Sequence, residues 1–119
     1  MILTDLIFGG RFNQNSNPLV MSSITMDPIV MTPESRLVRV HDKNLPLRNK
    51  EFDLFQYFLE HVGVVLTRTR LLEDVWDRNI FCSTNTVDVH VSTLRRKLKA
   101  LKCGNLIKTV HCVGYVMTP

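Results

Sequence analysis

The residues of this chain that are best placed to do chemistry together are basic, and they lie toward its C-terminal end. Residues 85–119 contain six lysines and arginines and one acidic residue, whereas residues 1–84 contain nine basic and ten acidic residues. Segregated positive charge raises the local concentration of a polyanion and speeds the encounter with it. Charge alone is equally compatible with a solvated, lysine-rich surface, so the neighbouring apolar residues decide the interpretation.

The basic residues fall on a predicted amphipathic helix at residues 85–102. Its apolar residues are spaced by four, three, four and three positions and form one stripe: Val87, Val91, Leu94, Leu98 and Leu101. The opposite side is basic and bears hydroxyl groups, and it also includes one valine. Its residues are Val89, Ser92, Thr93 and Arg96, with Lys99 and Asp88 at one edge. A helix buried on one side and basic on the other suits a DNA groove. Asp88 lies in the first turn, where the helix dipole favours an anion.

Metal and catalytic chemistry are not indicated by the remaining residue types. Cys82, Cys103 and Cys112 are separated by 21 and 9 positions and form no CxxC pair or zinc pattern, so we expect reduced thiols and no metal. The sequence contains no nucleophile elbow, phosphate loop or recognisably spaced carboxylate pair. We therefore expect neither an enzyme nor a cofactor.

Nothing in the sequence predicts insertion into a membrane. No apolar run approaches the roughly 18 residues that span a bilayer, and the first ten residues contain an acid where a signal peptide would carry basic residues. A cytosolic location is the resulting expectation.

The elements that must position the basic helix follow from periodicity and turn residues. Short β-prone runs and turns between residues 20 and 47 predict a small antiparallel sheet, with HDKN at 41–44 as a turn. Two helices follow, one with Asn49 as N-cap and ending at Gly63, the other beginning at Thr67 or Thr69. Ser83 or Thr84 is expected to cap the basic helix through its hydroxyl.

The apolar residues of these elements give the expected core, and the chain closes with a predicted hairpin. The first helix carries the stripe Phe52, Phe55, Leu59 and Val62, widened by Tyr57 and Phe58, and the second carries Leu71, Leu72, Val75 and Trp76 inward. Residues 106–117 predict a β-hairpin, and residues 1–19 read as a linker or poorly ordered arm. Residues 20–119 thus form one α+β domain with an N-terminal sheet, three helices and a C-terminal hairpin wing.

These elements, in this order, resemble the winged helix-turn-helix DNA-binding effector domain of OmpR/PhoB-type response regulators. The resemblance rests on NTVDVHVSTLRRKL followed by IKTVHCVGY, and extends upstream through LPLRNKEFDLFQYFLEHVGVVLTRTRLLEDVW. It implies sequence-specific binding of double-stranded DNA and transcription regulation, with the third helix in the major groove and the wing in the adjacent minor groove. It also implies pairs of domains on directly repeated half-sites, and a loop that can contact RNA polymerase.

The resemblance assigns specific residues to these roles. The candidate DNA contacts are Asn85, Val89, His90, Ser92, Thr93, Arg95, Arg96, Lys99, Thr109 and His111. The candidate polymerase loop is Asp77, Arg78, Asn79, Ile80 and Phe81. His90 lies at the edge of the apolar stripe, so a packed histidine is an alternative to a phosphate contact.

The departures from the family pattern are informative. Relatives often carry arginines where this chain has Ser92 and Thr93, so possible bidentate contacts to guanine are missing. His111-Cys112 stands where Arg-Gly is common in the wing, which removes a permissive glycine from the turn. Arg48 replaces a threonine cap, which breaks the reciprocal capping box of the first helix.

These departures motivate an alternative function, a winged-helix protein-interaction module that reads DNA weakly or has stopped reading it. Full-length relatives also place a phosphoacceptor receiver domain before this module. Residues 1–23 are too short to form one, so a sensor kinase is an expected partner only through a receiver domain that this sequence does not contain.

Overall fold

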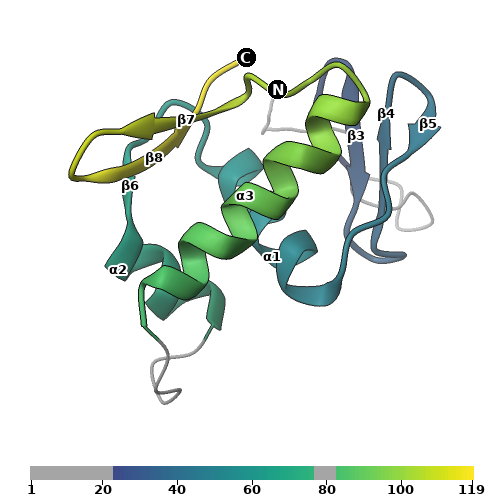
Figure 1. The fold of residues 1–119 in the computed structure, drawn as a ribbon. Coiled ribbons are helices and arrows are strands. Elements are labelled where there is room, and N and C mark those ends of the chain that lie inside the picture. Colours follow the sequence, from purple (N-terminus) through teal and green to yellow (C-terminus); the bar gives the residue numbers. More distant parts are fainter. Residues whose placement is uncertain (1–22, 77–82) are drawn as a thin grey trace.

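The computed structural model describes residues 23–76 and 83–119, which form two antiparallel sheets and three helical segments (Figure 1). The strands are β2 (Ile24–Met26), β3 (Ile29–Thr32), β4 (Leu37–Val40), β5 (Lys43–Asn44), β6 (Leu66–Thr67), β7 (Ile107–Val110) and β8 (Gly114–Met117). The helices are α1 (Asn49–Glu60), α2 (Arg68–Leu71), which continues as the π-helical turn η2 (Leu72–Trp76), and α3 (Asn85–Ala100). The predicted α+β winged-helix class is confirmed.

The N-terminal sheet has the order β2-β3-β4-β5, and every neighbouring pair is antiparallel. Alternation of residue types places one row of side chains in the core, because successive residues of a strand point to opposite faces. The buried row of the two central strands consists of Ile29, Met31, Val38 and Val40. The predicted turn at 41–44 is shorter than expected, since His41 and Asp42 take positive φ values and Lys43–Asn44 already pairs with β4 as β5.

The α1 helix buries a broader face than the sequence stripe indicated, and its ends differ from the prediction. Phe52, Phe55 and Phe58 are almost fully buried, and Leu54, which lies outside the predicted stripe, has no exposed area. Val62 was expected on this stripe, but it lies beyond the last helical residue and is 39% exposed. Gly63 has φ +82, the left-handed conformation that glycine adopts without steric cost.

The N-terminus of α1 corrects the predicted cap. The helix begins at Asn49, so Arg48 is the N-cap residue and Asn49 is not. Half of the capping box survives, because the backbone N–H of Arg48 donates to Glu51 Oε1 at 3.1 Å. The reciprocal bond is impossible, since a guanidinium has no acceptor.

The second helix begins where one of the two predicted threonines lies. Thr67 is its N-cap, with Oγ1 accepting from the N–H of Arg70 at 3.1 Å. Leu71, Val75 and Trp76 are buried and Leu72 is partly buried, as the sequence predicted.

The cap of α3 differs from expectation. Thr84 is the N-cap residue, but with φ −62 and ψ −17 it already has helical geometry, and its side chain makes no capping hydrogen bond. Backbone carbonyls accept instead, because the N–H of Thr86 donates to Ser83 and that of Val87 to Thr84. The predicted hydroxyl cap is therefore wrong.

The C-terminal hairpin gains a third strand that periodicity did not reveal. Strands β7 and β8 pair as predicted, and the two-residue β6 adds to β8, giving the order β6-β8-β7. Gly114 permits this pairing, because a Cβ at that position would lie 2.0 Å from the carbonyl oxygen of Leu66. In Figure 1 the wing and the N-terminal sheet lie on opposite sides of α3, with α1 packed behind it.

A largely buried ion pair joins the two long helices. Lys97 Nζ on α3 lies 2.5 Å from Glu51 Oε1 on α1, and the Glu51 side chain is only 5% exposed. Burial by itself raises the pKa of the Glu51 carboxyl, but the hydrogen bonds from Lys97 and from the Arg48 backbone bring it below its ordinary value. Glu51 is therefore a carboxylate that holds α3 against α1 at neutral pH.

Replacing this carboxylate should destabilise the fold in a pH-dependent way. We expect Glu51→Gln to lower the free energy of unfolding by about 2 kcal/mol at pH 7, between the values for exposed and fully buried pairs. Because the folded-state pKa is depressed, the contribution of Glu51 is present above the unfolded-state pKa and is lost as pH falls through the folded-state value. Urea unfolding at pH 7 and at pH 3 should show the difference between wild type and variant shrinking at the lower pH. A constant difference would contradict this assignment.

Candidate nucleic-acid interface

One side of α3 presents a row of exposed side chains away from the core. Val89 is 53% exposed, and Ser92, Arg96 and Lys99 are exposed as well, while Val87, Val91, Leu94 and Leu98 are fully buried on the opposite side. Asn85, the first helical residue, is also exposed. The side chains of Arg96 and Lys99 make no hydrogen bond or ion pair with another described residue. Their positive charges are available to a ligand.

Two candidate residues of α3 are engaged in local contacts. The Thr93 hydroxyl donates to the carbonyl of Val89 at 3.1 Å, and the side chain is partly buried. His90 Nδ1 donates to the carbonyl of Thr86 at 2.8 Å, and the imidazole packs edge-on against Trp76 with centroids 4.9 Å apart. His90 thus occupies the packed position that was the alternative to a phosphate contact.

Arg95 joins α3 to the wing. Its Nε donates to the carbonyl of Ile107 at 3.0 Å, and its Nη2 donates to the hydroxyl of Thr109 at 2.8 Å. Both acceptors belong to β7, so one guanidinium bridges the basic helix and the first strand of the hairpin. Two of the sequence-predicted contact residues, Arg95 and Thr109, are therefore bonded to each other.

The tip of the wing consists of three exposed residues, His111, Cys112 and Val113. The turn is closed by a hydrogen bond from the N–H of Val113 to the carbonyl of Val110 at 2.9 Å. Cys112 has φ +61, so a non-glycine residue takes the left-handed conformation that glycine would adopt more easily. The turn forms in spite of the missing glycine, and it presents His111 to solvent.

A second link between α3 and the wing was missed in the sequence. Asp88 Oδ1 accepts from Arg68 Nε at 2.8 Å and from the Tyr115 hydroxyl at 2.5 Å. These residues come from α3, the start of α2 and β8. The sequence indicated only a helix-dipole role for Asp88, because its partners lie 20 and 27 positions away and no local pattern pairs them.

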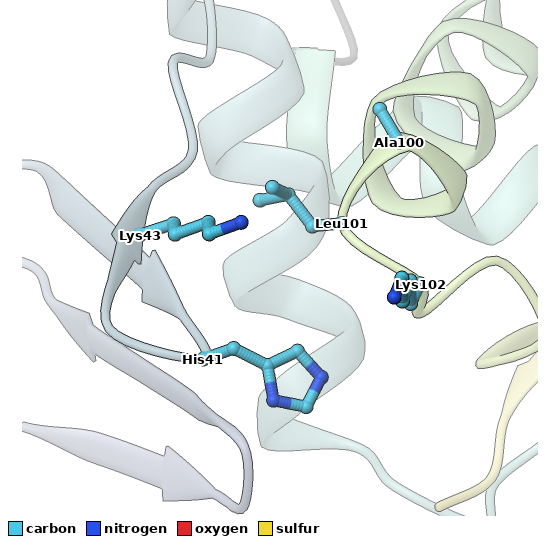
Figure 2. A pocket seen from close by; sticks show the side chains of 5 residues that line it. All are labelled: His41, Lys43, Ala100, Leu101 and Lys102. Carbon is cyan, nitrogen blue, oxygen red and sulfur yellow. The ribbon is translucent and has the colours of Figure 1, made fainter.

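The C-terminal end of α3 borders an open hollow of about 270 Å³ (Figure 2). It is lined by His41, Lys43, Ala100, Leu101 and Lys102. Lys43 extends from β5 toward Leu101 (Figure 2). The ionisable groups of its lining are two lysines and a histidine, so the hollow continues the basic character of α3.

The two cysteines in the described part of the chain, Cys103 and Cys112, are free thiols. Cys103 is buried, its Sγ lies 3.7 Å from His41 Nε2, and burial raises the pKa of its thiol. Within residues 23–76 and 83–119, no group of three His, Cys, Asp or Glu side chains could hold a metal ion. None of the helices in these ranges has the length and apolar character needed to cross a bilayer.

The predicted polymerase loop, Asp77, Arg78, Asn79, Ile80 and Phe81, lies outside the described residues, as does the arm at residues 1–19. The flanking elements are described. Lys50 Nζ donates to the carbonyl of Val75 at 3.0 Å and fixes the end of η2 against α1, directly before this segment.

Comparison with known proteins identifies a family whose sequence pattern this chain matches. Residues 42–117 match the family described as transcriptional regulatory protein, C terminal. The transcriptional regulatory protein PrrA of Mycobacterium tuberculosis is 40% identical over 95 residues, which are 80% of this chain and 41% of PrrA. The chain spans less than half the length of the curated relatives it matches.

Solved structures agree with the sequence comparison. The DNA-binding domain of RstA from Klebsiella pneumoniae, determined in complex with the RstA box, has a TM-score of 0.72 and 28% identity, covering 82% of this chain and 98% of that one. The response regulator DrrB of Thermotoga maritima, an OmpR/PhoB homologue, has a TM-score of 0.72 and 26% identity, covering 82% and 44%. The family is one of DNA-binding transcription regulators and is not known as an enzyme. The exposed basic helix, the wing tied to it and these likenesses together show that the chain belongs to the winged helix-turn-helix effector domains of OmpR/PhoB-type response regulators.

Proposed function

We propose that this chain reads a specific duplex sequence with the exposed side of α3 in the major groove and the β7–β8 wing in the adjacent minor groove. The observation that carries the proposal is the row Val89, Ser92, Arg96 and Lys99, which faces outward while the opposite stripe is fully buried. An α-helix fits the major groove, where each base pair presents a distinct pattern of donors and acceptors. The bound protein would regulate transcription as the effector part of a response regulator.

The chemistry of each exposed side chain indicates which part of the DNA it would contact. Arg96 is the candidate for a bidentate contact to guanine, and Val89 for an apolar contact to a thymine methyl. The remaining candidates on α3 for phosphate or base contacts are Asn85, Ser92, Thr93 and Lys99. On the wing, His111 would approach the minor groove, while Arg95, Thr109 and His90 would stabilise the surface through the contacts they make within the protein.

The proposal extends to the assembly on DNA. Two copies would bind directly repeated half-sites, and residues 77–81 would contact RNA polymerase. Residues 20–119 would form the binding domain, with residues 1–19 as a linker, and a sensor kinase would act through a receiver domain.

A duplex that carries two direct repeats should bind two copies of the chain cooperatively, and sedimentation of the complex measures this. Independent binding to the two repeats would oppose this assembly.

Selection of bound duplexes from a random pool is the experiment that tests sequence reading, and it supplies the probe for the measurements below. A set of bound duplexes that shares a motif is the expected result. Recovery of unrelated sequences would instead favour the alternative function, a winged-helix protein-interaction module. Three residues motivate that alternative, because relatives often carry a cation at their positions: Ser92, Thr93 and His111.

Binding should weaken steeply as salt rises. Each phosphate neutralised by a cation contributes about −0.9 to the slope of log K against log salt. Three contacts, for example from Arg96, Lys99 and one wing residue, would give a slope of about −2.7. Fluorescence anisotropy of a labelled selected duplex from 50 to 300 mM salt measures it, and a flat dependence would exclude the proposed interface.

Arg96 should matter for affinity rather than for folding. We expect Arg96→Ala to weaken binding to the selected duplex by about 1–3 kcal/mol if the guanidinium reads a base. The free energy of unfolding should change by less than about 0.5 kcal/mol, because the side chain is exposed. Equal losses on the selected duplex and on a scrambled one would reassign Arg96 to the phosphate backbone.

Arg95 provides the matched contrast, since it adjoins Arg96 and carries the same charge. Arg95→Ala removes two hydrogen bonds to β7, so we expect the free energy of unfolding to fall by about 1–2 kcal/mol. Urea denaturation of the two variants side by side measures the difference. If both variants were equally stable, the bridge to the wing would contribute nothing to the fold.

A further inference from the structure

We propose that Asp88 is a positioning residue for DNA reading, which holds the wing in a fixed orientation relative to α3 without touching DNA itself. The inference rests on the proposed function, because it concerns how α3 and the wing are held in the relative orientation that lets each enter its own DNA groove. It assigns a role to the one acidic residue among residues 85–119. A carboxylate on a surface that faces a polyanion opposes binding by its charge, so its presence there calls for a compensating role.

The contacts of Asp88 converge from three elements. Its Oδ1 accepts from Arg68 Nε at the start of α2 and from the Tyr115 hydroxyl of β8, at 2.8 and 2.5 Å. The side chains of Arg68 and Asp88 are 30% and 35% exposed, so both are partly shielded from solvent. One oxygen atom of α3 thus ties α3 to the second helix and to the inner strand of the wing.

Tyr115 carries this restraint into the hairpin. Its ring is largely buried, and the guanidinium carbons of Arg68 and Arg95 lie 5.4 and 5.2 Å from the ring centroid. Arg95 in turn binds the carbonyl of Ile107 and the hydroxyl of Thr109 on β7. Both strands of the hairpin are therefore bonded to α3, β8 through Asp88 and β7 through Arg95.

The base of the hairpin is held in the core by Ile107 and Met117, so the restraints from Asp88 and Arg95 act on the part nearer the turn, where Tyr115 pairs with Thr109. A two-stranded hairpin is marginally stable by itself, and β6 adds only the two residues Leu66 and Thr67 to its inner edge. Helix and wing must enter two different grooves at the same time. An unrestrained wing would lose conformational freedom on binding, and ordering of that kind lowers affinity.

The ionisation state of Asp88 is consistent with this role. Burial by itself raises the pKa of the carboxyl, but the hydrogen bonds from Tyr115 and Arg68 bring it below its ordinary value. The group is thus a charged acceptor at neutral pH, where both of its bonds have their full strength.

The test exploits two effects of opposite sign. Asp88→Ala removes a negative charge and frees Arg68, so electrostatics alone predicts equal or tighter binding to any duplex. Loss of positioning predicts weaker binding to the selected duplex only. Asp53→Ala is the matched control, since it makes the same charge change and breaks a similar ion pair, Arg36 to Asp53 at 2.9 Å, between α1 and the β3–β4 turn.

The measured quantity is the ratio of affinities for the selected and the scrambled duplex. We expect Asp88→Ala to lower this ratio by on the order of tenfold, within the range usual for coupling between sites, while Asp53→Ala leaves it unchanged. General destabilisation would not imitate this result, because a smaller folded fraction weakens binding to both duplexes by the same factor.

A second variant keeps the test decisive if Asp88→Ala does not fold. Tyr115→Phe retains the ring beside Arg68 and Arg95 and removes only the hydroxyl that binds Asp88, so the ratio should fall in the same direction. Amide exchange in residues 107–117, without DNA, should be faster in this variant than in wild type. An unchanged ratio in a folded variant overturns the positioning role alone. Failure of the wild type to prefer the selected duplex would overturn the proposed function as well.

Discussion

The packing of α3 against α1 is the contact on which the rest of this structure depends. Val87, Val91, Leu94 and Leu98 are fully buried, and each such side chain contributes about 1.5–3 kcal/mol relative to exposure. Their spacing fixes the rotation of the helix about its axis, so the outward side is determined by what the inward side buries. The ion pair between Lys97 and Glu51 adds a directional contact to this non-directional packing. The core therefore decides which residues of α3 are offered to DNA.

The cations of the basic segment are divided between two tasks. Lys97 donates to Glu51 on α1, and Arg95 donates to Ile107 and Thr109 on β7, so both cations already make hydrogen bonds within the protein. Arg96 and Lys99 are exposed on the outward side. A count of positive charges in residues 85–119 therefore overstates the number of strong donors available to DNA. The division explains how a helix with few outward charges can still belong to a DNA-binding family, because preorganisation of the surface lowers the cost of binding.

The wing shows how tertiary contacts compensate for unfavourable local residues. Cys112 takes a left-handed conformation that glycine would take more easily. The hairpin is nevertheless held by β6 and by bonds to Arg95 and Asp88. Gly114, by contrast, cannot be replaced without displacing the Leu66 carbonyl, since a side chain there would occupy the space that β6 requires. The position in the wing that requires glycine is therefore Gly114, where β8 pairs with β6, and not the turn at Cys112.

The sequence by itself determined the order of the elements, the inward stripe of α3 and the segregation of positive charge, because these depend on residues a few positions apart. The family resemblance added the winged helix-turn-helix family, which comparison with known proteins confirmed. Only the tertiary structure decided which polar side chains are bonded to distant elements. Asp88, Arg68 and Tyr115 are separated by 20 or more positions, as are Glu51 and Lys97, and no periodicity relates them. The caps of α1 and α3 also escaped prediction, since a backbone or side-chain acceptor can satisfy the same N–H group. Local patterns fix which side of an element is apolar, whereas the pairing of polar groups depends on how distant elements meet.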